Sequence, residues 1–336
     1  MTFEIKNLFD YILNNQEDNY VLATVVLLDG SSYRKPGVRM IISSSNKTYG
    51  NISGGCVEKD IIIKSKKVFD SNIPRIIKYD GTLRLGCEGI LTILLEPIHL
   101  EEDLIKNFYS SINNRKNIIF ESYFINKEIS NKTFGSVIKI QNKTFKLRNS
   151  FRIKDDKEIQ KYTQKLYPIL KLLIFGAEHD SVELCKIASI LGWQVTIVAP
   201  PDENKSIDFF NGASYFLNPT YDKINPDIVD DNCAVIIMSH SFNRDIQYLL
   251  ALKETFPKYF GILGPKKRKE KVLEKFLELY PDCSIKFLEQ IKGPVGLNIG
   301  SETAAEISIS IISEILKIIR NMDGISLSKK VKRIHD

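Results

Sequence analysis

The sequence has 336 residues, with 47 Lys and Arg against 41 Asp and Glu, which gives a formal net charge of +6 at pH 7. Hydrophobic residues make up 43% and charged residues 26% of the chain. This composition is that of a folded globular protein, and it excludes disordered, collagen-like and coiled-coil proteins as overall classes. A chain of this length predicts two domains.

Several features indicate a soluble cytoplasmic protein. No stretch is long and apolar enough to predict a membrane-spanning helix, and the opening residues MTFEIKNLFD lack the pattern of a secretory signal. The five cysteines are widely spaced and contain no C-x-x-C pair, which favours a reducing compartment. Much of the positive charge lies in two short runs, at 266–269 and 329–333. These runs are typical of a solvated helix start and a frayed terminus, so neither a membrane nor a nucleic acid is expected as a partner.

The first hundred residues predict an α+β domain. Apolar residues between positions 5 and 13 recur at helical spacing, which predicts a helix that ends near Asn14. Continuous aliphatic and β-branched runs predict buried strands at 21–28, 38–42, 76–77 and 90–95. Residues 101–165 are polar, and we interpret them as a helix and hairpin strands that bridge two domains.

The segment 166–322 predicts a Rossmann-like domain, and 323–336 a basic tail. Strand patterns at 170–175, 194–199, 234–239 and 259–263 alternate with helix patterns, which is typical of a doubly wound parallel sheet. Thr303 with Glu306 three residues later predicts a capping box at the start of the last helix. The predicted fold class is therefore α/β, an N-terminal α+β domain followed by a Rossmann-like doubly wound domain.

Two glycine-rich loops carry a thiol. Ser53, Gly54, Gly55 and Cys56 lie where a strand gives way to a helix. Glycines let backbone amides converge on an anion, and a helix N-terminus stabilises a thiolate, so Cys56 is a candidate nucleophile or soft-metal ligand. The other interpretation is a tight turn around a buried structural cysteine. A second loop, around Cys87, makes the chemical interpretation more attractive.

A third loop supplies cations and an aromatic ring. Tyr33, Arg34, Lys35 and Arg39 follow the first predicted strand. Arginine and lysine suit phosphate binding, because one offers a planar fork of donors and the other a compact charge. Thiols beside phosphate-binding cations suggest a phosphorylated ligand that contains sulfur.

The second domain contains an imperfect dinucleotide-binding turn. Gly176 follows a predicted strand and opens a helix, but Glu178 stands where the second glycine of the G-x-G-x-x-G pattern approaches a pyrophosphate. Glu178 therefore disfavours NAD or NADP. His179 and His240 follow two strand ends that should line one crevice, where each is either a structural group or a proton carrier or ligand.

Taken as an ordered set, the motifs resemble the XdhC/CoxI family. The set covers residues 30–40, 52–58, 85–89, 174–179, 239–245, 261–268 and 293–307. The resemblance implies an accessory protein, not a turnover enzyme, that binds molybdenum cofactor, a phosphorylated pterin dithiolene. It would protect the cofactor during sulfuration by a cysteine desulfurase and deliver it to a molybdenum hydroxylase apoprotein such as xanthine dehydrogenase.

The residues and the resemblance together give one candidate set. Cys56 is the candidate metal contact, and the resemblance is compatible with a homodimer. Two departures from the family pattern, Glu88 and Glu178, indicate an altered ligand preference or the loss of one binding mode. The candidate cofactor-binding residues are Ser32, Tyr33, Arg34, Lys35, Arg39, Ser53, Gly54, Gly55, Cys56, Cys87, Gly176, His179 and His240.

Two other functions remain open from the sequence. One is a nicotinamide-dependent oxidoreductase that uses the second domain. The other is a sulfur-relay protein that carries a persulfide on Cys56 or Cys87.

Overall fold

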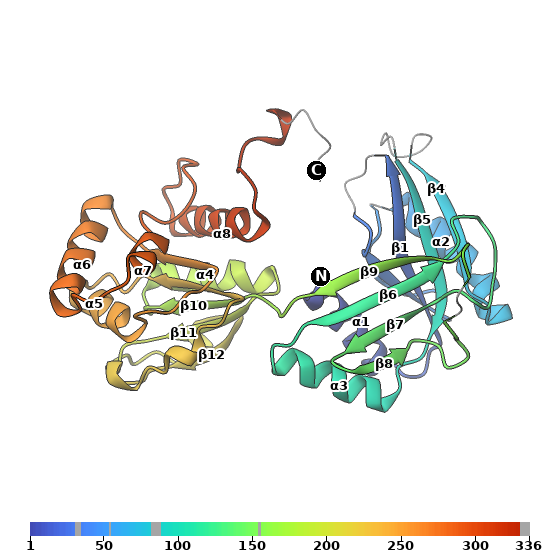
Figure 1. Ribbon diagram of the computed structural model, residues 1–336, viewed down its shortest axis with the longest axis horizontal. Coiled ribbons are helices and arrows are strands. Elements are labelled where there is room, and N and C mark those ends of the chain that lie inside the picture. Colours follow the sequence, from blue (N-terminus) through green and yellow to red (C-terminus); the bar gives the residue numbers. More distant parts are fainter. Residues whose placement is uncertain (31–34, 54, 82–88, 154–155, 330–336) are drawn as a thin grey trace. The chain divides into compact units, whose positions relative to one another are not determined.

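A computed structural model describes residues 1–30, 35–53, 55–81, 89–153 and 156–329, and of Cys56 it describes the backbone alone. The chain divides into two compact units (Figure 1). The first contains Met1–Pro168 and the segment from Ser326 onward, and the second contains Ile169–Ile325. Within the ranges given above, no helix has the length and apolarity needed to cross a lipid bilayer.

The first unit is built on an antiparallel sheet with the strand order β3-β2-β1-β5-β4. Alternate residues of β1 face opposite sides: Val21 and Ala23 pack in the core with Val57 of α2, whereas Leu22 packs in the core with Leu8 of α1. The sheet is therefore buried on both faces. Its elements are α1 (Thr2–Asn14), β1 (Tyr20–Gly30), β2 (Arg39–Ser43), β3 (Thr48–Gly50), α2 (Cys56–Ser71), β4 (Arg75–Asp80) and β5 (Gly89–Ile98).

A second antiparallel sheet completes the first unit. Its strands lie in the order β8-β7-β6-β9, and the segment that the sequence suggests as a bridge contributes all of them. Phe120 and Ile138 of this sheet share one buried core with Leu22 of β1. The segment is thus part of the first unit's core. Its elements are α3 (Glu102–Asn113), β6 (Ile118–Phe124), β7 (Gly135–Ile140), β8 (Lys143–Lys146) and β9 (Gln160–Leu166).

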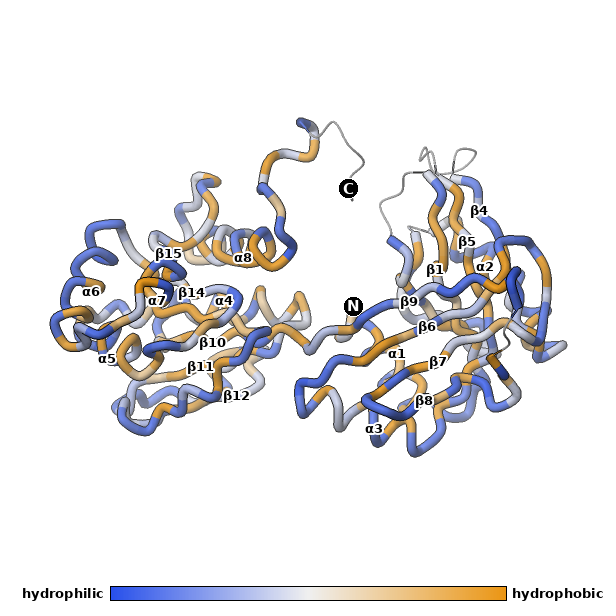
Figure 2. The backbone as a smooth tube through the Cα atoms, in the orientation of Figure 1, coloured by the Kyte–Doolittle hydropathy of each residue, from blue (hydrophilic) through white to orange (hydrophobic). Residues whose placement is uncertain are grey.

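The second unit contains a six-stranded parallel sheet, which confirms the predicted Rossmann-like fold. Its strand order is β12-β11-β10-β13-β14-β15, so the chain reverses direction across the sheet between β10 and β13. The central strands are continuously hydrophobic, as buried parallel strands are (Figure 2). The strands are β10 (Lys171–Phe175), β11 (Gln194–Val198), β12 (Ala213–Leu217), β13 (Cys233–Ile237), β14 (Tyr259–Ile262) and β15 (Ile291–Lys292).

Helices cover both faces of this sheet. Leu172 and Ile174 of β10 share a core with α4 and α8, whereas Leu173 and Phe175 share a core with α5, α6 and α7. The predicted capping box is confirmed, because Thr303 N–H donates to Glu306 Oε2 at 2.9 Å and Glu306 N–H donates to Thr303 Oγ1 at 3.3 Å. The helices are α4 (His179–Ile190), α5 (Phe242–Ala251), α6 (Lys266–Leu279), α7 (Ile285–Gln290) and α8 (Ala304–Arg320).

Candidate functional site

Three motif loops leave the first sheet at the same end. Gly30, the last residue of β1, pairs with Gly89, the first residue of β5, and the loop at 81–88 precedes that residue. Gly50, the last residue of β3, pairs with Met40 of β2. The residue at which the 31–38 loop enters β2 therefore lies beside the residue from which the 51–55 loop leaves β3. The strand ends that flank these loops, far apart in the sequence, therefore lie at one end of the sheet.

The loop before α2 is fastened by Glu58. The carboxylate of Glu58 accepts hydrogen bonds from the N–H groups of Ile52 (3.0 Å), Ser53 and Gly55 (2.8 Å), and from the Ser53 hydroxyl (2.8 Å). Burial alone would raise the pKa of Glu58, but the hydrogen bonds from Ser53 and Gly55 outweigh it, and the net pKa is lowered. The amides of residues 53 and 55 thus converge on an anion, and that anion is the chain's own carboxylate. A ligand anion at these two amides has to compete with Glu58.

Several predicted site residues lie outside the described part of the chain. Cys56 is the first residue of α2, and its backbone, but not its side chain, is described. Lys35 is described and exposed, at the end of the first motif loop. The candidates outside the described residues are Ser32, Tyr33, Arg34, Gly54 and Cys87, together with the departure Glu88.

Arg39 is a buried cation at the start of β2. Its guanidinium carbon lies 3.7 Å from the centroid of the Phe120 ring, and Nη1 donates to the carbonyl of Gly37 at 2.8 Å and to Gln164 Oε1 at 2.5 Å. Burial lowers the pKa of Arg39 to about 10, so the guanidinium remains charged at neutral pH. Its Nε and Nη2 atoms are buried and have no hydrogen-bond partner among the described residues.

A cavity of about 280 Å³ lies beside Arg39. It is lined by the first turns of α1 and by the ends of β2 and β3 from which two motif loops depart. Gly37 and Asn51 border it on the side of those loops. The cavity therefore gives the motif region a concave surface next to a buried positive charge. Its lining residues are Glu4, Ile5, Asn7, Leu8, Gly37, Val38, Arg39, Tyr49, Gly50 and Asn51.

At the reversal point of the second unit, a side-chain contact joins the segment after β13 to the start of α4. His240 follows β13 with a φ of 55°, and its Nε2 lies 2.9 Å from Oδ2 of Asp180 in the first turn of α4. The turn at Gly176 approaches β13 closely, because a Cβ atom there would lie 2.5 Å from the carbonyl oxygen of Met238. His179 is the exposed first residue of α4. The structure thus brings Gly176, His179 and His240 close together beyond the carboxyl ends of β10 and β13.

The turn that carries His240 is anchored by hydrogen bonds to the buried carboxylate of Asp245. Asp245 is 1% exposed and accepts hydrogen bonds from the N–H of Ser239 at 3.3 Å and from its hydroxyl at 2.5 Å. Its other oxygen lies 2.6 Å from Nη2 of Arg268 in α6. Asp245 therefore fixes the conformation of the 239–241 turn.

The place that a dinucleotide pyrophosphate would occupy carries negative charge. Glu178 is the residue before α4, and Asp180 lies in its first turn. A cation beside this turn, Lys205, donates to the carbonyl of Ala177 at 2.9 Å and to Glu203 at 3.1 Å. Two carboxylates at the N-terminus of a helix repel a phosphate, which agrees with the inference from Glu178.

Glu58, Asp180 and Asp245 have no predicted role from the sequence. Glu58 follows Gly55 by three residues, which is the spacing of a capping box, so this contact had a local signal. Asp180 and His240 are 60 positions apart, and no pattern in the sequence joins them.

Comparison with known proteins agrees with this architecture. A model of the "XdhC and CoxI family" matches residues 13–80, and a model of the "XdhC Rossmann domain" matches residues 172–315, in the order of the two units. The chain belongs to the XdhC and CoxI family.

Relatives of this XdhC and CoxI family member span most of its length. A Bacillus subtilis protein, named as a probable xanthine dehydrogenase subunit, is 24% identical over 341 residues, which cover 92% of this chain and 96% of the relative. "Molybdenum cofactor insertion chaperone PaoD" of Escherichia coli is 23% identical over 303 residues, which cover 89% of this chain and 83% of the relative. A crystal structure from Bacillus halodurans, described as a xanthine dehydrogenase, has a TM-score of 0.77 at 26% identity over 98% of both chains.

Proposed function

We propose that the protein is a chaperone that binds molybdenum cofactor, protects it during sulfuration by a cysteine desulfurase, and delivers it to a molybdenum hydroxylase such as xanthine dehydrogenase. The observation that carries the proposal is that the described strand ends flanking the three motif loops all lie at one end of the first sheet. The name of the Escherichia coli relative supports the identity of the cargo, and that of the Bacillus subtilis relative supports the class of client enzyme.

The first unit has groups that suit this cargo. The cofactor carries a phosphate, and Arg39 places a buried positive charge with unpartnered donors beside the 280 Å³ cavity. In the proposal Ser32, Tyr33, Arg34 and Lys35 join Arg39 around the phosphate and pterin. Ser53, Gly54 and Gly55 form the adjoining wall, where the Glu58 carboxylate limits how much negative charge the loop accepts.

Sulfur ligands complete the proposed site. Cys56 stands at the N-terminus of α2, where the helix dipole favours a thiolate, and molybdenum is a thiophilic metal. In the proposal Cys56, with Cys87 from the neighbouring loop, contacts the metal or its sulfur. The proposal also includes a second contact surface in the Rossmann domain, made by Gly176, His179 and His240.

Cofactor retention tests this function. The protein is produced together with the cofactor biosynthetic pathway and purified without oxygen, and its bound molybdenum and pterin are then measured. Wild-type protein is expected to retain both, and Cys56→Ser to lose most of them. Cys283→Ser, which changes a partly exposed thiol in the other unit, is the matched control and should retain them. A wild-type protein that retains no pterin would overturn the proposal.

One observation favours a nicotinamide enzyme instead, namely the strand order of the second sheet, which is that of dinucleotide-binding domains. The carboxylates of Glu178 and Asp180 at the start of α4 oppose it. Calorimetric titration with NADH and NADPH separates the two functions, because the chaperone is expected to bind neither. Micromolar binding with turnover would favour the enzyme.

A further inference from the structure

A larger cavity lies at the opposite end of the first sheet from the motif loops. Its volume is about 550 Å³, which is within the range of small-molecule sites. Tyr20 and Ile98, which pair at this end of the β1–β5 ladder, both line it, whereas Gly30 and Gly89 pair at the motif end. The cavity is therefore separate from the proposed cofactor site.

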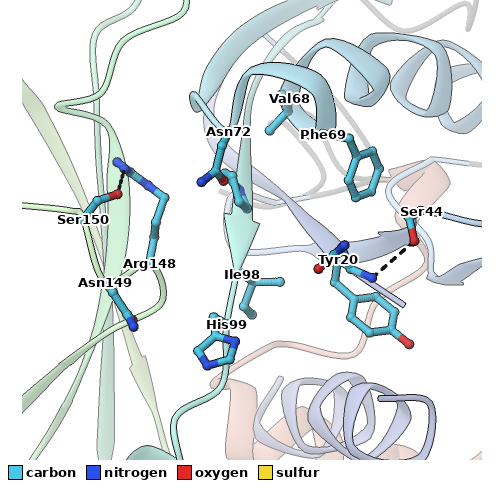
Figure 3. Close-up of a pocket in the computed structure, with 12 residues that line it drawn as sticks. Tyr20, Ser44, Val68, Phe69, Asn72, Ile98, His99, Arg148, Asn149 and Ser150 are labelled. Atoms are coloured by element: carbon cyan, nitrogen blue, oxygen red, sulfur yellow. Dashed lines mark hydrogen bonds between the residues drawn. The ribbon is translucent and has the colours of Figure 1, made fainter. Parts of the chain in front are cut away.

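The cavity has two polar ends and an apolar middle (Figure 3). Arg148, Asn149 and Ser150 lie on one side of the view, and Ser44 lies on the other. Val68 and Phe69 from the last turn of α2, with Ile98, lie between them. Among the described residues that line the cavity there is no Asp or Glu. The remaining lining residues are Asn19, Tyr20, Asn72, Pro97 and His99.

Arg148 gives one end a fixed positive charge. It is 6% exposed, and its guanidinium donates to the Ser150 hydroxyl and to the carbonyls of Lys132 at 2.8 Å and Phe134 at 3.0 Å. These three acceptors are neutral, and within the described residues Arg148 has no carboxylate in ion-pair contact. The nearby carboxyl group of Glu96 is turned to Ser136. A buried charge that lacks an ion-pair partner is costly, so an anion at this end would be stabilising.

The opposite end attracts hydrogen-bond donors. The Ser44 hydroxyl accepts a hydrogen bond from Asn19 N–H at 3.2 Å and donates to Asp18 Oδ1 at 2.8 Å. Asp18 does not line the cavity, but its carboxylate holds the Ser44 hydroxyl at this end. Phe69 and Ile98 offer apolar surface between the two ends, suitable for a flat ring.

We propose that this cavity binds a nucleoside monophosphate, with the phosphate beside Arg148, Asn149 and Ser150 and the base between Phe69 and Ser44. Glu96 acts on Arg148 through space, and the phosphate supplies an anion in direct ion-pair contact, which Arg148 lacks among the described residues. The base supplies a flat face for Phe69 and amino or ring N–H donors for the Ser44 end. The site is independent of cofactor retention by the motif loops, because the two lie at opposite ends of the sheet.

Histidine resonances locate the ligand. The chain has four histidines, and among the described ones His99 lines the cavity while His179 and His240 lie in the other unit. The imidazole signal of His99 is assigned as the one that is lost in His99→Gln. In NMR titrations with GMP this signal is expected to shift and to reach saturation, whereas the chemical shifts of His179 and His240 are expected not to change. Guanosine and inorganic phosphate, tested separately, should bind at least about tenfold more weakly than GMP. Equal binding of guanosine, a shift confined to the other histidines, or no saturation would overturn the proposal.

One added negative charge tests the orientation in which the nucleotide is proposed to bind. Asn149→Asp adds a carboxylate next to Arg148 without changing side-chain size and should weaken GMP binding at least about tenfold. Asn142→Asp is the matched control, because Asn142 is an exposed residue that does not line the cavity, and it should leave GMP binding unchanged. Unchanged GMP affinity in Asn149→Asp, with the fold intact by circular dichroism, would contradict the assignment of the phosphate end.

Discussion

Glu58 accepts hydrogen bonds from both the backbone N–H and the hydroxyl of Ser53, so the loop before α2 is organised around a carboxylate. The contact links the sequence motif to its function in two ways. It holds the loop in the conformation that leads into Cys56, and it sets a negative charge where an anionic ligand would otherwise bind. Removal of that charge should separate the two effects.

Glu58→Gln is expected to destabilise the protein at neutral pH by about 0.5–2 kcal/mol, because an amide oxygen replaces the carboxylate that the capping N–H groups need. The pKa of Glu58 is lowered in the folded state, so its contribution is present above the unfolded pKa and is lost as the pH falls through the folded pKa. Denaturant titrations should therefore show the wild-type and variant free energies of unfolding converging below about pH 4. A difference that is constant with pH would contradict the ionised carboxylate as the cause.

A second buried carboxyl group predicts the opposite pH dependence. Glu96 is fully buried, and burial raises its pKa to about 7, despite hydrogen bonds from Ser136 and the positive charges of Arg148 and Arg39. The folded state therefore binds a proton more tightly than the unfolded state, and stability is lost as the pH rises from about 4.5 to about 7. From pH 5 to pH 8, the free energy of unfolding of Glu96→Gln should rise relative to wild type by up to about 3 kcal/mol.

Glu121→Gln is the matched control for that measurement. Glu121 is also buried in the first unit, but the ammonium group of Lys139 lies 2.8 Å from it, and that of Lys161 lies 3.5 Å away. Burial alone would raise its pKa, and these contacts, with Tyr123, lower it overall. At pH 8 Glu121→Gln should have a lower free energy of unfolding than wild type. This is opposite to Glu96→Gln, whose free energy of unfolding should rise relative to wild type between pH 5 and pH 8. Parallel pH profiles for the two variants would contradict both assignments.

The sequence predicts the second unit well because its signals are local. Buried parallel strands are continuous apolar runs, and β10, β11, β13 and β14 all read that way. The helix that the sequence places after Gly176 is observed as α4, which begins at His179. Edge strand β12 is not predicted, because only one side of it pairs and residues such as Tyr215 are exposed.

The candidate site is predicted less completely, because its contacts are between distant residues. The glycine and thiol motifs are visible in the sequence, and the strand register that brings their loops together is not. Arg39 is a candidate phosphate ligand in the sequence, and no local pattern predicts that it is buried against Phe120 and Gln164, which come from a sheet that begins nearly 80 residues later. Such pairings depend on tertiary packing, which local patterns do not encode.

Gly176 gives a test of the turn at the reversal point. Its φ of +136° is strained for any other residue, and a Cβ atom would lie 2.5 Å from the Met238 carbonyl oxygen. Gly176→Ala should therefore lower the free energy of unfolding by more than about 2 kcal/mol. Gly300→Ala is the control, because Gly300 also has positive φ, at +74°, but no atom lies within 4 Å of the Cβ position. Its loss should be only about 1 kcal/mol, as measured by thermal or denaturant unfolding.

Asp245 should be the most sensitive carboxylate in the Rossmann domain. Asp245 is 1% exposed, and Asp245→Asn removes the charge that pairs with Arg268, whose side chain is 25% exposed and so stays partly hydrated, so we expect a loss of about 2–3 kcal/mol in the free energy of unfolding. Asp202→Asn breaks a pair of similar geometry, 2.8 Å from Arg244, but the Asp202 side chain is 71% exposed, and the loss should stay below about 1 kcal/mol. Because Asp245 also fixes the turn that carries His240, the His240 NMR signal should move in Asp245→Asn and stay in place in Asp202→Asn. Similar losses for the two variants would show that burial does not determine the strength of the Asp245 contact.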